Sequence, residues 1–163
     1  MRRVLLLLVF CSTGFGQEQT TPGEVVQRFF KTMATHDVNS ARALFTANAS
    51  LTSVRADGTT ATSTFEKWLE HLAASKEKWL ERTWNEKVLE RAPLAVLWAD
   101  YEFYLNGKFS HCGVDSFTLV KTAEGWKIAA ATDTRRQRRV HQIRSAPSLA
   151  GGICRMHGRA LFD

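Results

Sequence analysis

The stretch Trp98–Thr134 constrains the fold more than any other part of this sequence. It is rich in aromatic and β-branched residues, and two turn signals divide it, Asn106-Gly107 and Ala123-Glu124-Gly125. Asn-Gly between such runs favours a two-residue hairpin, because both turn positions need a positive φ angle. Aromatic and β-branched residues suit a pleated, half-buried surface. The stretch therefore predicts three consecutive antiparallel strands.

A turn at Asn106-Gly107 also predicts the register of the first two strands. Glu102 would then face His111, and Trp98 would face Asp115. Because side chains alternate along a strand, one face of the sheet should combine aromatic and ionisable residues. The expected members of this face are Trp98, Asp100, Glu102, Tyr104, His111, Asp115 and Phe117, and the other face holds Ala99, Tyr101, Phe103, Cys112 and Val114. A one-residue bulge near Gly113 would reverse the side chains beyond it.

Upstream of these strands, capping signals and apolar periodicity predict mainly helices. Thr21-Pro22-Gly23-Glu24 has the spacing of a capping box, and apolar residues then recur at helical intervals. In chain order we expect a helix over 22–35, a short helix capped by Asp37, a strand pair within 49–62, a helix opened by Ser63-Thr64-Phe65-Glu66, and a strand over 83–91. Helices followed by an antiparallel meander predict an α+β fold.

The first 16 residues have the pattern of a secretory signal peptide. A basic start, an apolar run over residues 4–10 and small residues before Gln17 follow one another. The apolar run is too short to span a bilayer. We therefore expect a secreted or periplasmic protein with no stable membrane insertion after cleavage. The alternative is a lipoprotein anchored through Cys11.

The net charge of +6 comes from the ends of the chain and not from its central part. Residues 134–163 contain seven arginines and one acid, whereas residues 17–133 carry a net charge of −2. We expect one domain over 17–134 and a basic, poorly ordered tail over 135–163, which lacks hydrophobic periodicity. The arginines at the start of the tail suit contact with phosphate. Export and the lack of a binding motif argue against a nucleic-acid partner.

Two cysteines, Cys112 and Cys154, remain after the signal peptide. An exported protein permits a disulfide between them. The alternative is that Cys112 is a small buried residue and Cys154 lies in the tail. We expect the second arrangement.

Three segments of the chain resemble a known superfamily. They are residues 35–49 after the first helix, Asp57-Gly58 before a capped helix, and residues 117–128, which include Gly125-Trp126-Lys127-Ile128. In this order they resemble the nuclear transport factor 2-like (NTF2-like) superfamily, and within it the SnoaL-like and lumazine-binding-like bacterial branches. The resemblance covers about residues 22–134. It implies a cone, in which a curved antiparallel sheet wraps the first helix and encloses a pocket, and a homodimer formed through the sheet.

The predicted pocket contains two candidate catalytic residues. His111 is a candidate general base near neutral pH, positioned by Glu102 across the strand pair. Asp115 beside Trp98 is a candidate for a carboxyl group whose pKa is raised by desolvation. The structural alternatives are a Glu102–His111 pair at the rim and a hydrogen-bonded core aspartate. Both interpretations stay open at this point.

The remaining residues of the predicted polar face are candidates for ligand contact. These are Trp98, Asp100, Glu102, Tyr104 and Phe117. The chain has no glycine-rich phosphate loop and no Gly-x-Ser-x-Gly elbow, and its His, Asp and Glu spacing matches no metal motif. We therefore expect no metal and no cofactor.

Three functions fit this pattern, because the fold alone does not define one. The first is an exported domain that binds a small, largely apolar ligand in the pocket. The second is a cofactor-free enzyme of the isomerase, dehydratase or cyclase type that uses acid–base residues in the same pocket. The third is a dimeric interaction module with a vestigial pocket.

Overall fold

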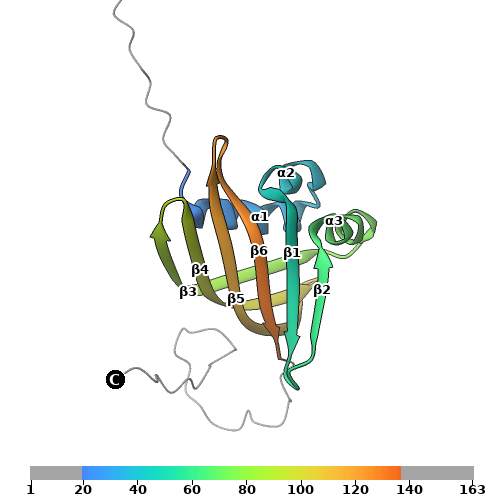
Figure 1. Cartoon of the computed structure of the whole chain (residues 1–163). Coiled ribbons are helices and arrows are strands. Elements are labelled where there is room, and N and C mark those ends of the chain that lie inside the picture. Colours follow the sequence, from blue (N-terminus) through green and yellow to red (C-terminus); the bar gives the residue numbers. More distant parts are fainter. Residues whose placement is uncertain (1–19, 137–163) are drawn as a thin grey trace, which may run out of the picture.

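The computed structural model describes residues 20–136 as a curved sheet packed against helices (Figure 1). The elements are α1 Pro22–Thr35, α2 Val38–Ala43, β1 Phe45–Arg55, β2 Thr60–Thr64, α3 Phe65–Ala74, β3 Trp79–Arg91, β4 Leu94–Leu105, β5 Lys108–Thr122 and β6 Gly125–Arg135. The strand order is β2-β1-β6-β5-β4-β3. Neighbouring strands are antiparallel except β1 and β6, which are parallel. The predicted α+β fold is confirmed.

The helix ends follow from their capping residues. In α1 the Thr21 hydroxyl accepts from the Glu24 backbone N–H (3.3 Å), and the Glu24 carboxylate accepts from the Thr21 N–H (2.7 Å), as the sequence predicts. Asp37 caps α2, also as predicted. The cap of α3 is Thr64, which accepts from the Lys67 N–H, so this helix begins one residue later than the predicted capping box.

Aromatic side chains join the helices to the inner face of the sheet. The Phe29 ring on α1 lies 4.9 Å from Phe45 on β1 and 6.1 Å from Phe117 on β5. Phe45 in turn stacks on Phe65 of α3 at 3.6 Å. These four rings are buried. Burial of such large apolar surfaces is the main favourable term in folding, and it fixes α1 and α3 over the concave side.

The register of β4 and β5 differs from the prediction by one residue. Tyr104 pairs with Phe109 as expected, but the next pair is Phe103 with His111, so Ser110 has no partner in the ladder. This is a β-bulge, and it lies before the position near Gly113 where the sequence suggested one. A bulge reverses every side chain beyond it.

Because of the bulge, both predicted faces of the sheet combine the wrong residues of β4 and β5. Glu102 faces Cys112 instead of His111, and Trp98 faces Ser116 instead of Asp115. The inner face combines Leu97, Ala99, Tyr101 and Phe103 from β4 with His111, Asp115 and Phe117 from β5. Ala99, Tyr101 and Phe103, which we expected on the opposite face, therefore point into the cone.

Strand β6 continues past the predicted domain boundary at residue 134. Arg135 belongs to the strand, and Arg136 pairs with Cys112 through two backbone hydrogen bonds of 2.9 and 3.2 Å. Cys112 is buried and disulfide-bonded, so the expectation of an unpaired residue is wrong. Cys154, the predicted signal peptide and residues 137–163 of the predicted tail lie outside the described residues.

Gly113 sits where β5 approaches β6 most closely. A Cβ atom at this position would lie 1.7 Å from the backbone oxygen of Thr134. The neighbouring Val114 N–H donates to the Thr134 hydroxyl at 2.9 Å. Since the obstructing atom belongs to the backbone, the strands would have to separate to admit a side chain.

We expect Gly113→Ala to lower the free energy of unfolding by about 3 kcal/mol, the upper range for overpacking a tight contact. Chemical denaturation measures this change. Gly23→Ala in α1 is the matched control, because nothing lies within 4 Å of the added methyl group, and alanine favours a helix. Equal denaturation midpoints for the two variants would contradict the close approach at Gly113.

Candidate functional site

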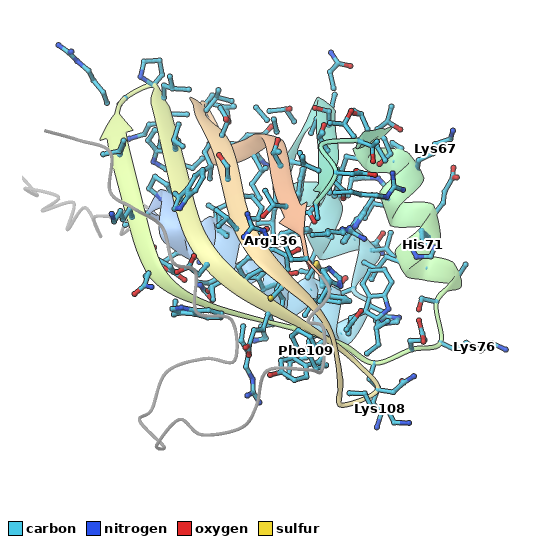
Figure 2. The ribbon with its side chains drawn as sticks, turned by 90° about the horizontal axis from the view of Figure 1, so that it is seen from below. Lys67, His71, Lys76, Lys108, Phe109 and Arg136 are labelled. Carbon is cyan, nitrogen blue, oxygen red and sulfur yellow. The ribbon has the colours of Figure 1, made fainter. Side chains whose placement is uncertain are left out.

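A cavity of about 920 Å³ lies between the inner face of the sheet and the helices. Its walls are mainly aromatic and aliphatic. Phe29 and Met33 of α1, Trp68 of α3, Trp79 of β3, Phe103 of β4 and Phe117 of β5 contribute to them. Figure 2 shows α3, which carries the cavity residue His71, beside β1 and β2. The cavity thus reaches from the long strands to α3.

The structure brings three of the predicted site residues to the cavity. His111, Asp115 and Phe117 line it. Their roles in catalysis or binding remain predictions. They reach the same wall because they alternate along β5 beyond the bulge.

The other four predicted site residues lie on the outer face, which corrects their placement in the pocket. Trp98 is 50 % exposed. Asp100 accepts a hydrogen bond from Asn85 (2.8 Å), and Glu102 accepts one from the Tyr104 hydroxyl (2.8 Å). The bulge at Ser110 is the physical reason, since it reverses β4 relative to β5.

Several polar residues of the cavity were not predicted from the sequence. They are Ser53, Glu81, Tyr101, Asp133 and Arg135. Glu81 was missed because β3 begins at Trp79, four residues before the expected start at 83. The alternation of Trp79, Glu81 and Thr83 is a signal from which the earlier start of this strand could have been predicted. Arg135 was assigned to the tail.

Asp133 is held by three neighbours from three strands. The Ser53 hydroxyl donates to its Oδ1 (2.6 Å), and the Tyr101 hydroxyl donates to its Oδ2 (3.1 Å). The Arg135 guanidinium donates to the same Oδ2 at 2.7 Å. Burial and the charge of Asp133 raise the pKa of Tyr101, so its phenol stays a hydrogen-bond donor. Asp133 and Arg135 therefore form a fixed ion pair in the wall.

Asp115 and Glu81 form a second, different carboxyl site. Their side chains are hydrogen-bonded to each other, which requires that one of them is protonated. Burial, then the negative charge of Glu81, raises the pKa of Asp115 well above its ordinary value. Burial also raises the pKa of Glu81 to about 7. Both shifts favour the protonated form, so the folded pair tends to keep a proton that it would lose in water.

Two buried polar atoms of the cavity residues have no hydrogen-bond partner among the described residues. They are Oδ2 of Asp115 and Nε1 of Trp79, on side chains that are 5 % and 7 % exposed. The first is an acceptor and the second is a donor. Buried polar atoms are normally satisfied, because leaving one unpaired costs about 1–3 kcal/mol.

His111 lies against aromatic rings. Its ring centroid is 5.1 Å from that of Phe103 and 5.8 Å from that of Tyr101. Burial, and then the charge of Arg135, lowers the pKa of His111 to about 4. The imidazole is therefore neutral at pH 7. The predicted partnership with Glu102 is wrong, and His111 is not poised to titrate near neutral pH.

The described residues show no metal site. Within 20–136, no group of three or more His, Cys, Asp or Glu side chains is arranged to hold a metal ion. Over the same range, no helix combines the length and the apolar character needed to cross a membrane.

The curved sheet around α1, with its enclosed cavity, defines an NTF2-like fold, and solved structures confirm it. An NTF2-like protein of unknown function from Shewanella baltica has a TM-score of 0.55 at 12 % identity and covers 71 % of this chain and 91 % of its own. A protein of unknown function from Mycobacterium tuberculosis has a TM-score of 0.59 at 16 % identity, with 71 % and 70 % covered. A "putative dehydratase from the NTF2-like family" from Streptomyces avermitilis has a TM-score of 0.57 at 14 % identity, with 71 % and 94 % covered.

Sequence comparison places the chain within one branch of this superfamily. Residues 17–133 match the family described as "Putative lumazine-binding". The chain belongs to this family. A search of curated proteins gave no match. At identities this low, the solved structures show the fold alone.

We expect stability to fall by at least about 1 kcal/mol as pH rises from 6.5 to 8.5, because Glu81 ionises in this range and the raised pKa of Asp115 acts in the same direction. Folding raises the pKa of Glu81 from 4.5 to about 7. The protonated form is therefore favoured in the folded state, and its contribution is lost as pH rises through 7. His111 has the opposite sign, but its lowered pKa costs stability only below about pH 6.5. Melting temperatures across this pH window measure the effect.

Glu81→Gln should reduce this pH dependence, because it removes the ionisation of Glu81 and its charge beside Asp115. Glu70→Gln is the matched control, since Glu70 is exposed on α3. Wild-type protein and the Glu70 variant should give parallel profiles. If all three proteins show the same slope between pH 6.5 and 8.5, the carboxyl pair does not share a proton in the folded state.

Proposed function

We propose that this protein binds a small, largely apolar ligand in the cavity of its cone. The observation that carries this proposal is the pair of unsatisfied polar atoms, Asp115 Oδ2 and Trp79 Nε1, in a cavity that also has large aromatic walls. A cavity of about 920 Å³ falls in the range of small-molecule sites, which combine apolar walls with a few convergent polar groups. The family's description also supports ligand binding.

The two unsatisfied atoms describe what the ligand must offer. An acceptor on the ligand would take the hydrogen bond of the Trp79 indole, and a donor would satisfy Asp115. Each bond would offset a desolvation cost of about 1–3 kcal/mol for the buried atom that it satisfies. The surrounding rings of Trp68, Phe103 and Phe117 would bury the apolar body of the ligand.

We further propose that binding takes place outside the cytoplasm and in a dimer. The signal-peptide pattern of residues 1–16 supports export. The outer sheet face, where Trp98 is half exposed, supplies an apolar surface for a second copy. Neither property is needed for the cavity itself.

The neutral fluorescent probe N-phenyl-1-naphthylamine tests whether the cavity binds apolar molecules. We expect wild-type protein to bind one probe molecule per chain with increased fluorescence. Ala131→Trp, which fills the cavity from β6, should weaken binding at least tenfold. Ala130→Trp is the control, because Ala130 is the neighbour of Ala131 in β6 but does not line the cavity. Equal binding by both variants would place the probe elsewhere and contradict the proposal.

A second candidate function is a cofactor-free isomerase, dehydratase or cyclase, and the Glu81–Asp115 pair favours it. A protonated Asp115 can act as an acid, while a Glu81 pKa of about 7 matches a base that works at neutral pH.

For this second function we expect Asp115→Asn to abolish turnover without loss of probe binding. Mass spectrometry of small molecules that co-purify with the protein identifies the compound to assay. The same compound is then incubated with wild-type and variant protein. Turnover of a compound that proceeds equally in the Asp115 variant would exclude the carboxyl pair from the chemistry.

A further inference from the structure

We infer that the ligand of this cavity carries an ammonium group, which lies between the carboxyl groups of Glu81 and Asp115. The inference rests on the proposed ligand binding and defines its chemical class as an amine with an aromatic or aliphatic body. It follows from three features of the described residues: the distribution of charge, the unsatisfied oxygen of Asp115, and the rings around the carboxyl pair.

The first feature is that, within residues 20–136, the cation that acts on the carboxyl pair is already paired with another carboxylate. Arg135 is the cationic group whose charge reaches both Glu81 and Asp115 among the described residues. Its guanidinium is already ion-paired with Asp133 at 2.7 Å. The proton shared between Glu81 and Asp115 therefore substitutes for a missing positive charge. A bound cation would stabilise a carboxyl pair of this kind, in which Asp115 is buried and Glu81 is partly buried.

The second feature is the unpaired Oδ2 of Asp115. An ammonium group has three N–H donors and no acceptor. It can donate to this oxygen and to Glu81 at the same time, which a hydroxyl group with its single donor cannot do. When it does so, the proton that Asp115 holds is released to solvent, and the two carboxylates face one ammonium group.

The third feature is the set of rings beside the pair. Phe103 lies directly opposite Glu81 in the β3–β4 ladder, and Trp79 precedes Glu81 by two residues on the same strand face. The centroids of these two rings are 5.9 Å apart at 73°. Aromatic faces attract ammonium groups. The same wall would disfavour a ligand carboxylate, because Glu81, with a pKa of about 7, is ionised at pH 7.5 and would face it.

The other titratable side chains of the cavity lie on different elements. Arg55 of β1, His71 of α3 and Glu77 before β3 also line it. Arg55 donates to the Thr59 hydroxyl at 3.4 Å, and neither it nor Glu77 contributes to the raised pKa values of the carboxyl pair. His111 and Tyr101 are neutral near pH 7.

Three indoles that differ only in their polar end test the inference. Tryptamine carries an ammonium group, tryptophol a hydroxyl and indole-3-acetate a carboxylate. In isothermal titration calorimetry at pH 7.5, tryptamine should bind at least tenfold more tightly than tryptophol, and indole-3-acetate should bind most weakly. Glu81→Gln and Asp115→Asn should remove the preference for tryptamine. Glu70→Gln should retain it.

The affinity for tryptamine should also rise about a hundredfold from pH 6 to pH 8, because the release of one proton on binding changes the affinity about tenfold per pH unit. Titrations in buffers with different ionisation enthalpies measure this proton release. Tryptophol should show neither the pH dependence nor the release. Binding of N-phenyl-1-naphthylamine by the Glu81 and Asp115 variants checks that their cavities stay intact.

The outcomes separate the inference from the proposed function. If tryptophol binds as tightly as tryptamine, or if the preference for tryptamine survives Glu81→Gln, the cavity binds ligands but not through an ammonium group. If N-phenyl-1-naphthylamine and all three indoles fail to bind, both the inference and the proposed ligand binding are overturned.

Discussion

The extra residue at Ser110 is the constraint on which the site depends. Without it, Glu102 would share the inner face with His111 and Asp115, and Tyr101 would point outward. With it, Tyr101 turns inward to Asp133, and Glu102 turns outward to Tyr104. A single unpaired residue thus decides which half of the polar side chains of β4 belongs to the cavity. Bulges next to functional sites often re-aim side chains in this way.

The cavity contains two carboxyl sites with opposite electrostatic character. Asp133 accepts hydrogen bonds from Ser53, Tyr101 and Arg135. Among the described residues Asp115 has no such set of donors, and burial beside Glu81 raises its pKa. The two carboxyl groups therefore differ in environment because their hydrogen-bond partners differ. The Asp133–Arg135 ion pair fixes this part of the wall, and the Glu81–Asp115 pair holds an exchangeable proton.

Local signals in the sequence predicted the elements well but the site only in part. The capping box at Thr21 and the Asn106-Gly107 turn act within a few residues, so α1 and the first pairs of the β4–β5 hairpin could be derived. The bulge at Ser110 could not, because it carries no glycine or other local signature, and the packing of the whole sheet selects it. The early start of β3 and the inward placement of Arg135 likewise depend on neighbouring strands. His111 and Asp115 were identified because they belong to β5, whose face was assigned correctly.

Gly113 has a consequence beyond the close approach of two strands. It lies opposite Tyr101 in the β4–β5 ladder, and its missing side chain leaves room for the tyrosine to reach over β5 to β6. The Tyr101 hydroxyl donates there to Asp133 and to the Thr134 backbone oxygen. The Tyr101 side chain of β4 thereby reaches β6 across Gly113 of β5 and links the three strands. The polar end of the cavity is consequently preorganised by folding. A ligand that binds there does not have to order these side chains, so the entropy cost of binding is smaller.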